Sequence, residues 1–211
     1  MNWTQAFLVF TLAVPFGIAQ QKQTLRPWPS ASEIMASDAR GVPLREANLS
    51  PTERDAVRNV TLDDIRDYCG ADNKEESVFE RLIVEKIHLA DDGPITILLK
   101  GGGNGENGSR CLCGATGNCL TWVVRVAGGK GTVLYNYFGG GIVILKSQSH
   151  GYFNFVTAGH ASARDSDLEI WRYNGEKYQE FRCASLRSDT GKISERDCRR
   201  RNRNSKLSRN R

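Results

Sequence analysis

The sequence IVILKSQSHGYFNFVTAGHASARDSDLEIWRYNGEKYQEFRC, residues 142–183, decides the fold class. It contains three runs rich in β-branched and aromatic residues, at 142–146, 152–157 and 168–182, which are separated by polar or glycine-containing breaks. Such runs are typical of consecutive antiparallel strands. We therefore expect a mainly β protein in which neighbouring strands follow one another along the chain.

The third run contains Asn174-Gly175, which indicates a tight turn because both residues tolerate a positive φ. A two-residue loop would place Arg172 opposite Lys177, and Glu169 opposite Glu180, and like charges that face each other across strands are destabilising. A three-residue loop, 173–175, avoids these contacts, and we favour it. The pairs expected from this register are Arg172 with Glu176, Ile170 with Tyr178 and Trp171 with Lys177.

Further strands are expected before this stretch. The runs 78–89 and 94–100 flank an acidic turn and predict a hairpin, and the runs 120–126 and 132–138 are joined by a glycine-containing turn. Together with the strands above, they make an antiparallel meander of about eight strands. Residues 101–109, between the two hairpins, are so rich in glycine that we expect a mobile surface loop.

Two short N-terminal helices are expected on one face of this sheet, which makes the fold class α+β. Ser50 is a predicted N-cap, with Pro51 in the first turn and Glu53 as the capping-box partner. A second helix start follows at 61–64, and Gly70 is placed to end that helix. The product is two short helices or one kinked helix, with an apolar side that covers the sheet. The residues on that side are Val57, Val60, Leu62, Ile65 and Tyr68.

The composition, 39% hydrophobic and 25% charged, fits one globular domain with tails. We divide the chain into a signal peptide (1–19), an extended arm or linker (20–49), a single β-rich domain (50–190) and a basic tail (191–211). The apolar run at 6–19 ends in small residues that a signal peptidase accepts, and it is shorter than the roughly 20 residues that span a membrane. We therefore expect a secreted or periplasmic protein, with no transmembrane segment after signal removal.

The positive charge of the chain lies in its tail. Residues 191–211 contain nine basic and two acidic residues, a balance of +7 within a total of +5, so residues 1–190 carry −2. The tail is expected to be disordered because it has almost no apolar residues. It can attract anionic envelope polymers or lipid headgroups, whereas nucleic acid is not expected because the tail lacks interleaved aromatic residues. The arginines concerned are Arg199, Arg200, Arg201 and Arg203.

The cysteines predict a disulfide-stabilised domain, because an even number in an exported chain favours disulfides. Six cysteines can pair in many ways, and the sequence alone does not choose among them. Cys113 and Cys119 bracket a flexible loop that can close locally, and Cys183 and Cys198 are placed to tie down the tail. The full set is Cys69, Cys111, Cys113, Cys119, Cys183 and Cys198.

Two catalytic interpretations centre on His160. Residues 155–160, FVTAGH, resemble the segment around the catalytic histidine of chymotrypsin-like and streptogrisin-like serine proteases, where the histidine acts as a general base. However, only 51 residues follow His160, too few for a second barrel, and no Gly-Asp-Ser-Gly-Gly motif occurs. Cys119 is a second candidate partner, because a thiolate beside an imidazolium is a strong nucleophile. The competing interpretation is a disulfide at Cys119.

No metal or cofactor is expected, because the cysteine spacing does not match paired zinc ligands and no zinc-protease or calcium-loop motif occurs. Asp165, Asp167 and Glu169 cluster near His160 and can support acid–base chemistry, but alternate strand residues that point the same way also fit a solvated face. A recognition surface is expected in this loop, since exposed loops on a rigid sheet often carry binding residues. The binding candidates are His160, Ser162, Arg164, Asp165 and Trp171.

The chain resembles a group of small exported bacterial proteins of unknown function. The shared features are a Cys-Gly-x-x-Gly-Asn-Cys loop at 113–119 and a His-x-Ser-Ala segment at 160–163, followed by a hairpin with tyrosine and glycine and then by Cys183. This resemblance implies an exported β-rich domain and supplies no activity. We expect a non-enzymatic exported domain that binds a cell-envelope component or a protein partner. The alternative is an exported hydrolase that uses His160 with Cys119 or a nearby carboxylate.

Overall fold

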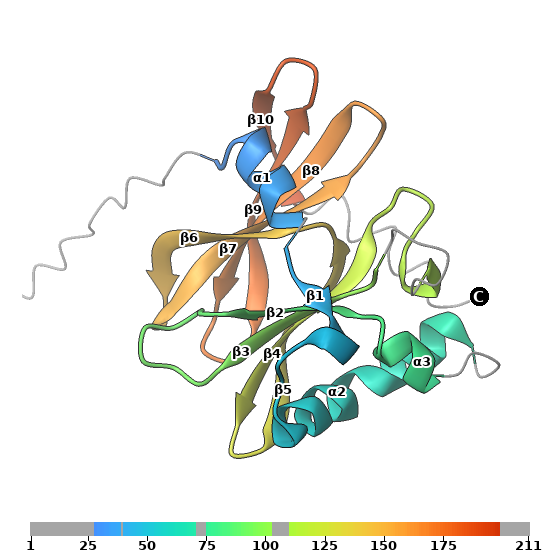
Figure 1. The fold of residues 1–211 in the computed structure, drawn as a ribbon. Coiled ribbons are helices and arrows are strands. Elements are labelled where there is room, and N and C mark those ends of the chain that lie inside the picture. The colour runs from blue at the N-terminus through green and yellow to red at the C-terminus, as the bar shows by residue number, and fades with distance from the viewer. Residues whose placement is uncertain (1–27, 39, 71–74, 103–109, 199–211) are drawn as a thin grey trace, which may run out of the picture.

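The computed structural model describes residues 28–38, 40–70, 75–102 and 110–198 (Figure 1). The described chain is mainly β, with ten strands in two five-stranded antiparallel sheets. Sheet A has the order β1 (Val42–Pro43), β2 (Ile83–Ile87), β3 (Thr96–Lys100), β4 (Cys119–Ala127) and β5 (Lys130–Gly139). Sheet B has the order β10 (Lys192–Arg196), β9 (Tyr178–Arg187), β8 (Asp165–Tyr173), β7 (Tyr152–His160) and β6 (Ile142–Ser149).

The expected single meander of about eight strands is therefore wrong, because β5 does not pair with β6, although the predicted hairpins on either side of this break are present. The chain leaves sheet A after Gly139 and enters sheet B at Ile142. At this corner the backbone N–H of Gly140 donates a hydrogen bond to the carbonyl oxygen of Ala158, at 2.6 Å. Because glycines carry no Cβ, the backbone can pass this close to β7 and change sheets.

Side chains from both sheets form the central core. The ring of Tyr135 on β5 packs edge-on against Phe155 of β7 and Trp171 of β8, with centroid distances of 5.3 and 4.8 Å. Such edge-to-face contacts match the positive ring edge to the negative ring face. All three residues are buried, so the aromatic residues hold the two sheets together.

Helices cover the outer faces of the two sheets (Figure 1). Helix α2 (Pro51–Cys69) packs on β4 and β5, and its buried Ile65 joins a core cluster with Trp122 and Leu99. Helix α1 (Ala31–Asp38) packs on sheet B, where Ile34 contacts a second outer cluster. Strands with cover on both faces are buried along most of their length, which explains the continuous buried runs of β4 and β7.

The predicted start and end of α2 are confirmed. The Ser50 hydroxyl accepts a hydrogen bond from the Glu53 backbone N–H, the Glu53 carboxylate accepts one from the Ser50 backbone N–H, and Gly70 ends the helix with φ of 76°. The predicted division into two helices is wrong, because the helix continues through Thr61. The buried Thr61 hydroxyl donates to the Val57 carbonyl oxygen, so it is satisfied within the helix.

Several short elements were not expected from the sequence. The predicted extended arm contains α1, β1 and the 3₁₀ turn η1 (Leu44–Glu46), and Leu44 is fully buried. Helix α3 (Glu75–Phe79) replaces the first residues of the strand expected at 78–89, and η2 (Arg110–Leu112) precedes β4. The predicted basic tail begins with β10, which pairs with β9. These segments are held in place by contacts with residues that lie far away in the sequence.

Both hairpin registers considered for β8 and β9 are wrong. The loop has four residues, 174–177, and Tyr173 pairs with Tyr178. The Asn174 side-chain oxygen accepts hydrogen bonds from two backbone N–H groups of the loop, and Gly175 has φ of 102°. This register buries both tyrosine rings in the central core, which outweighs the charge pairing at the surface. The observed pairs are Tyr173 with Tyr178, Arg172 with Gln179 and Trp171 with Glu180.

All six cysteines are bonded, in the pairs Cys69–Cys111, Cys113–Cys119 and Cys183–Cys198. The last two are the pairs that sequence proximity indicated. None of the described helices is long and apolar enough to cross a membrane. The predicted signal peptide at 1–19, the glycine-rich segment at 103–109 and the tail arginines Arg199, Arg200, Arg201 and Arg203 lie outside the described residues.

Candidate functional site

The candidate site lies at the end of β7, where His160 is exposed. A short turn connects this strand to β8, and it is closed by backbone hydrogen bonds from Ala161 and Ser162 to the carbonyl oxygen of Asp165. The Ser162 hydroxyl also donates to the Asp165 carboxylate, at 3.0 Å, and accepts from the backbone N–H of Arg164. Serine and aspartate make such local contacts readily, so the turn is fixed by its own side chains.

A second loop, 113–119, is docked onto this end of β7 by Asn118. The side-chain amide of Asn118 donates to the His160 carbonyl oxygen, at 2.9 Å, and its side-chain oxygen accepts from the His160 backbone N–H, at 2.7 Å. Asn118 is buried, and the Cys113–Cys119 disulfide closes the loop that carries it. The loop before β4 of sheet A is thereby attached to β7 of sheet B.

Two hollows flank His160. The first, which we call the His160 pocket, has a volume of about 310 Å³, an apolar floor, walls of glycine backbone and a polar rim. The second, of about 420 Å³, is more open and lies over the β7–β8 turn. The His160 pocket is lined by Ile34, Gly117, Gly140, Gly141, Ala158, Gly159, His160, Ser166, Leu186 and Ser188. The second hollow is lined by Thr116, His160, Ser162 and Ala163.

The polar rim of the His160 pocket is available for hydrogen bonding. Within the part of the chain that the structure describes, the imidazole of His160 and the hydroxyls of Ser166 and Ser188 make no hydrogen bond to another side chain or to the backbone. Each of these groups can both donate and accept a hydrogen bond. The pocket therefore combines an apolar floor with a few polar groups that converge at its edge, as small-molecule sites commonly do.

The binding residues predicted from the sequence do not all lie on one surface of the structure. His160 and Ser162 line the hollows, and Arg164 and Asp165 lie in the adjoining turn. Trp171 does not belong to this surface: it is 8% exposed, and its indole N–H donates to the Thr157 hydroxyl, at 2.8 Å. Its assignment as a binding residue is therefore wrong, because the central core buries its ring.

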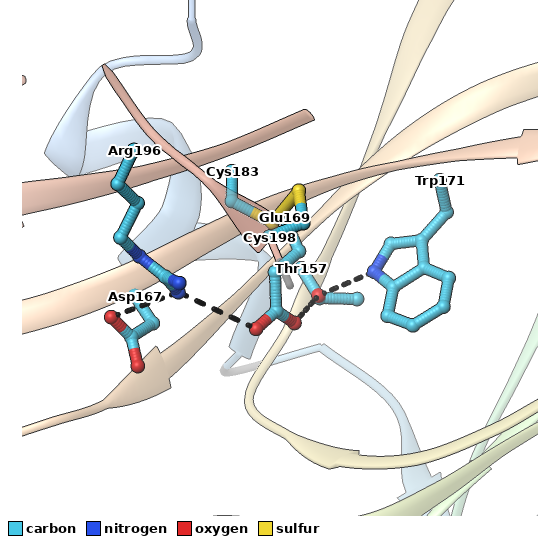
Figure 2. The surroundings of a disulfide bond; sticks show 7 residues. All are labelled: Thr157, Asp167, Glu169, Trp171, Cys183, Arg196 and Cys198. Carbon is cyan, nitrogen blue, oxygen red and sulfur yellow. Dashed lines mark hydrogen bonds and ion pairs between the residues drawn. A yellow bond between two sulfur atoms is a disulfide. The ribbon is translucent and has the colours of Figure 1, made fainter. Parts of the chain in front are cut away.

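The carboxylates of β8 do not form the solvated face considered above. Figure 2 shows that Asp167 and Glu169 point toward Arg196 of β10, with oxygen–nitrogen distances of 3.1 and 3.9 Å. Glu169 is 3% exposed and also accepts a hydrogen bond from the Thr157 hydroxyl, at 3.3 Å. A buried carboxylate needs such partners, so this network ties β10 to the sheet. The role of Arg196 could not be recognised from the sequence, because its partners lie on β8, two strands away in the sheet.

A disulfide excludes Cys119 as the catalytic partner of His160. Cys119 is bonded to Cys113, so the nucleophilic thiolate considered for Cys119 does not exist in this structure. The Asp165 carboxylate is held by Ser162, and no hydrogen bond or ion pair joins the His160 imidazole to another described residue. A general base is normally oriented by such a partner.

One group of potential metal ligands occurs among the described residues, formed by Glu180, Cys183 and Cys198. The two sulfur atoms of this group are bonded to each other. A metal-binding cysteine must be a thiolate, so this group offers a single carboxylate.

Comparison with known proteins leaves the site to be interpreted from its own geometry. No family model matches the chain, and neither the curated proteins nor the solved structures contain a match.

Proposed function

We propose that this protein is a non-enzymatic exported domain that binds a cell-envelope component at the surface around His160. The observation that carries the proposal is the His160 pocket, whose rim offers an imidazole and the hydroxyls of Ser166 and Ser188 above an apolar floor. The second hollow extends this surface over the turn that contains Ser162. The two hollows share His160, so a ligand longer than one pocket can contact both.

Three disulfides support the exported location, because disulfides persist in oxidising compartments. They also explain how a surface built from loops keeps its shape. The Cys113–Cys119 disulfide and the Asn118 amide hold one wall of the site, and the Ser162–Asp165 contact holds the next loop. A rigid site loses little conformational entropy when a ligand binds.

The tail arginines provide a second contact in this proposal. Arg199, Arg200, Arg201 and Arg203 follow directly after Cys198, which is bonded to β9. Clustered arginines attract anionic polymers and lipid headgroups, and this attraction weakens as the salt concentration rises. The tail would therefore concentrate the protein at an anionic envelope surface, and the His160 surface would provide the selectivity.

The test is co-sedimentation of the mature protein, residues 20–211, with insoluble cell-wall material and with membrane vesicles from the producing organism. The variant His160→Ala, combined with Arg164→Ala, is expected to weaken binding to the recognised fraction by about tenfold, since central contact residues typically cost about 1–2 kcal/mol or more on truncation. Both side chains are exposed, so the fold should persist.

The matched control is His88→Ala. His88 is also exposed, but it precedes Leu89, whose carbonyl oxygen bonds to Phe153 near the opposite end of β7. This variant is expected to bind as the unaltered protein does. Equal binding by all three proteins, or binding to neither fraction, would exclude the proposed surface.

A further inference from the structure

The His160 pocket is small and its floor is aliphatic. Ile34 of α1, Ala158 of β7 and Leu186 of β9 are all buried and form this floor. A volume of about 310 Å³ lies at the lower end of the range of about 300–1,000 Å³ that is usual for ligand pockets. The size fits a short alkyl chain or the side chain and backbone of one small residue, and it is too small for a sugar chain or a polycyclic ligand.

Glycine backbone keeps the pocket open. Gly117, Gly140, Gly141 and Gly159 contribute to the walls, and none of them carries a side chain that would fill the space. Gly117 has φ of 79°, a conformation that favours glycine, and a Cβ on Gly159 would lie 3.4 Å from the side-chain oxygen of Asn118. The backbone conformation of the 113–119 loop therefore favours glycine at position 117 of this wall.

The polar groups of the lining are hydrogen-bond donors. The hydroxyls of Ser166 and Ser188 and the imidazole of His160 can all donate hydrogen bonds, and none of the described lining residues is acidic. The backbone of Arg164 adjoins this rim, because the Arg164 carbonyl oxygen accepts a hydrogen bond from the Ser188 backbone N–H, at 2.8 Å. Three donor groups, with no acidic residue among the lining residues, suit a group that only accepts hydrogen bonds, such as a carboxylate.

We infer that the His160 pocket binds a short aliphatic group that ends in a carboxylate, either a free short-chain acid or the C-terminal residue of a peptide. The alkyl part lies on Ile34, Ala158 and Leu186, and the carboxylate accepts hydrogen bonds from Ser166, Ser188 and His160. This inference rests on the proposed binding function and specifies its ligand chemistry.

The test measures dissociation constants for four probes with the mature protein by titration calorimetry or amide chemical shifts. Hexanoate is compared with hexanamide, and N-acetyl-alanyl-alanine is compared with its C-terminal amide. Each carboxylate is expected to bind at least about tenfold more tightly than its amide, because charge-assisted hydrogen bonds are roughly twice as strong as neutral ones. Binding of the peptide acid but not of hexanoate identifies a peptide C-terminus as the source, and the reverse identifies a free acid.

The double variant Ser166→Ala, Ser188→Ala locates the carboxylate. It is expected to weaken binding of the preferred carboxylate by about tenfold, because two hydrogen bonds to a charged group are lost. Ser194→Ala, an exposed serine on β10, is the control and is expected to have no effect. Equal thermal unfolding of the three proteins shows that the fold is retained.

Three results would overturn the inference: no carboxylate binds, each amide binds as well as its acid, or the double variant binds as well as the control. These outcomes are separate from those of the envelope test. If envelope binding depends on His160 and Arg164 but no carboxylate binds, only the inferred ligand chemistry is wrong. Carboxylate binding without binding to any envelope fraction removes only the envelope function.

Discussion

The side-chain amide of Asn118 pairs with the backbone of His160 as a neighbouring strand would, donating to its carbonyl oxygen and accepting from its N–H. The two residues are 42 positions apart: Asn118 precedes β4 of sheet A, and His160 ends β7 of sheet B. Because Asn118 is buried, both hydrogen bonds are partly shielded from water. This contact places one wall of the His160 pocket.

We expect Asn118→Ala to destabilise the protein by about 1–3 kcal/mol, because two hydrogen bonds to the backbone of His160 are lost. The same variant is expected to weaken ligand binding at the pocket, since its wall is no longer held. Urea unfolding measures the first effect. Asn59→Ala, an exposed position in α2, is the control and should not lower stability. An Asn118→Ala protein as stable as the control would show that the contact does not hold the loop.

The indole of Trp122 provides a second prediction. Trp122 is fully buried, and its N–H donates to the Asp64 carboxylate of α2, at 2.7 Å. Asp64→Ala leaves this donor without its partner, so we expect a loss of about 1–3 kcal/mol and a change in tryptophan fluorescence. Asp67→Ala, an exposed residue of the same helix, should change neither. Identical unfolding midpoints for the two variants would contradict this role of Asp64.

The helix cap makes stability depend on pH. Burial of the Glu53 carboxylate by itself would raise its pKa, but hydrogen bonds from Lys86 and Ser50 and the charge of Lys86 together lower it below 4.5. The unfolded chain therefore takes up this proton at a higher pH than the folded protein does. The resulting stability is complete above pH 4.5 and is lost as the pH falls through the lower, folded pKa.

Unfolding free energies measured from pH 7 to pH 3 test this linkage. In Glu53→Gln the carboxylate is absent, so the decrease below pH 4.5 is expected to be smaller than in the unaltered protein. Glu46→Gln, at an exposed position, is the control and should keep the full decrease. The same pH profile for both variants would show that Glu53 does not contribute.

The three disulfides should differ in their contribution to stability. The bonds Cys69–Cys111, Cys183–Cys198 and Cys113–Cys119 join residues that are 42, 15 and 6 positions apart. The chain-entropy relation gives losses of about 4, 3 and 2 kcal/mol when each pair is replaced by alanine. Denaturant unfolding of the three double variants tests this order. If replacing the Cys113–Cys119 pair instead causes the largest loss of stability, the native contacts around this disulfide contribute more than loop entropy does.

Local features were predictable from the sequence because they depend on residues close together in the chain. The capping box of Ser50 and Glu53, the helix end at Gly70 and the neighbouring β hairpins follow from short-range hydrogen bonding and residue preference. The short disulfide at 113–119 is of the same kind. The strand predicted at 152–157 is also present, although it continues to His160, which was expected in the following loop.

Tertiary structure decided every feature that depends on burial between distant segments. The inward direction of Glu169 and Trp171, the four-residue loop after Tyr173 and the placement of α1 over sheet B all result from packing a second sheet onto the first. Alternation along a strand shows which residues share a face, but it does not show which face is covered. The sequence by itself indicated most of the strands, the two ends of α2 and the cysteine pairs that are close in the chain. The His160 pocket, by contrast, exists only because Asn118, the glycines at 140–141 and α1 converge on the end of β7.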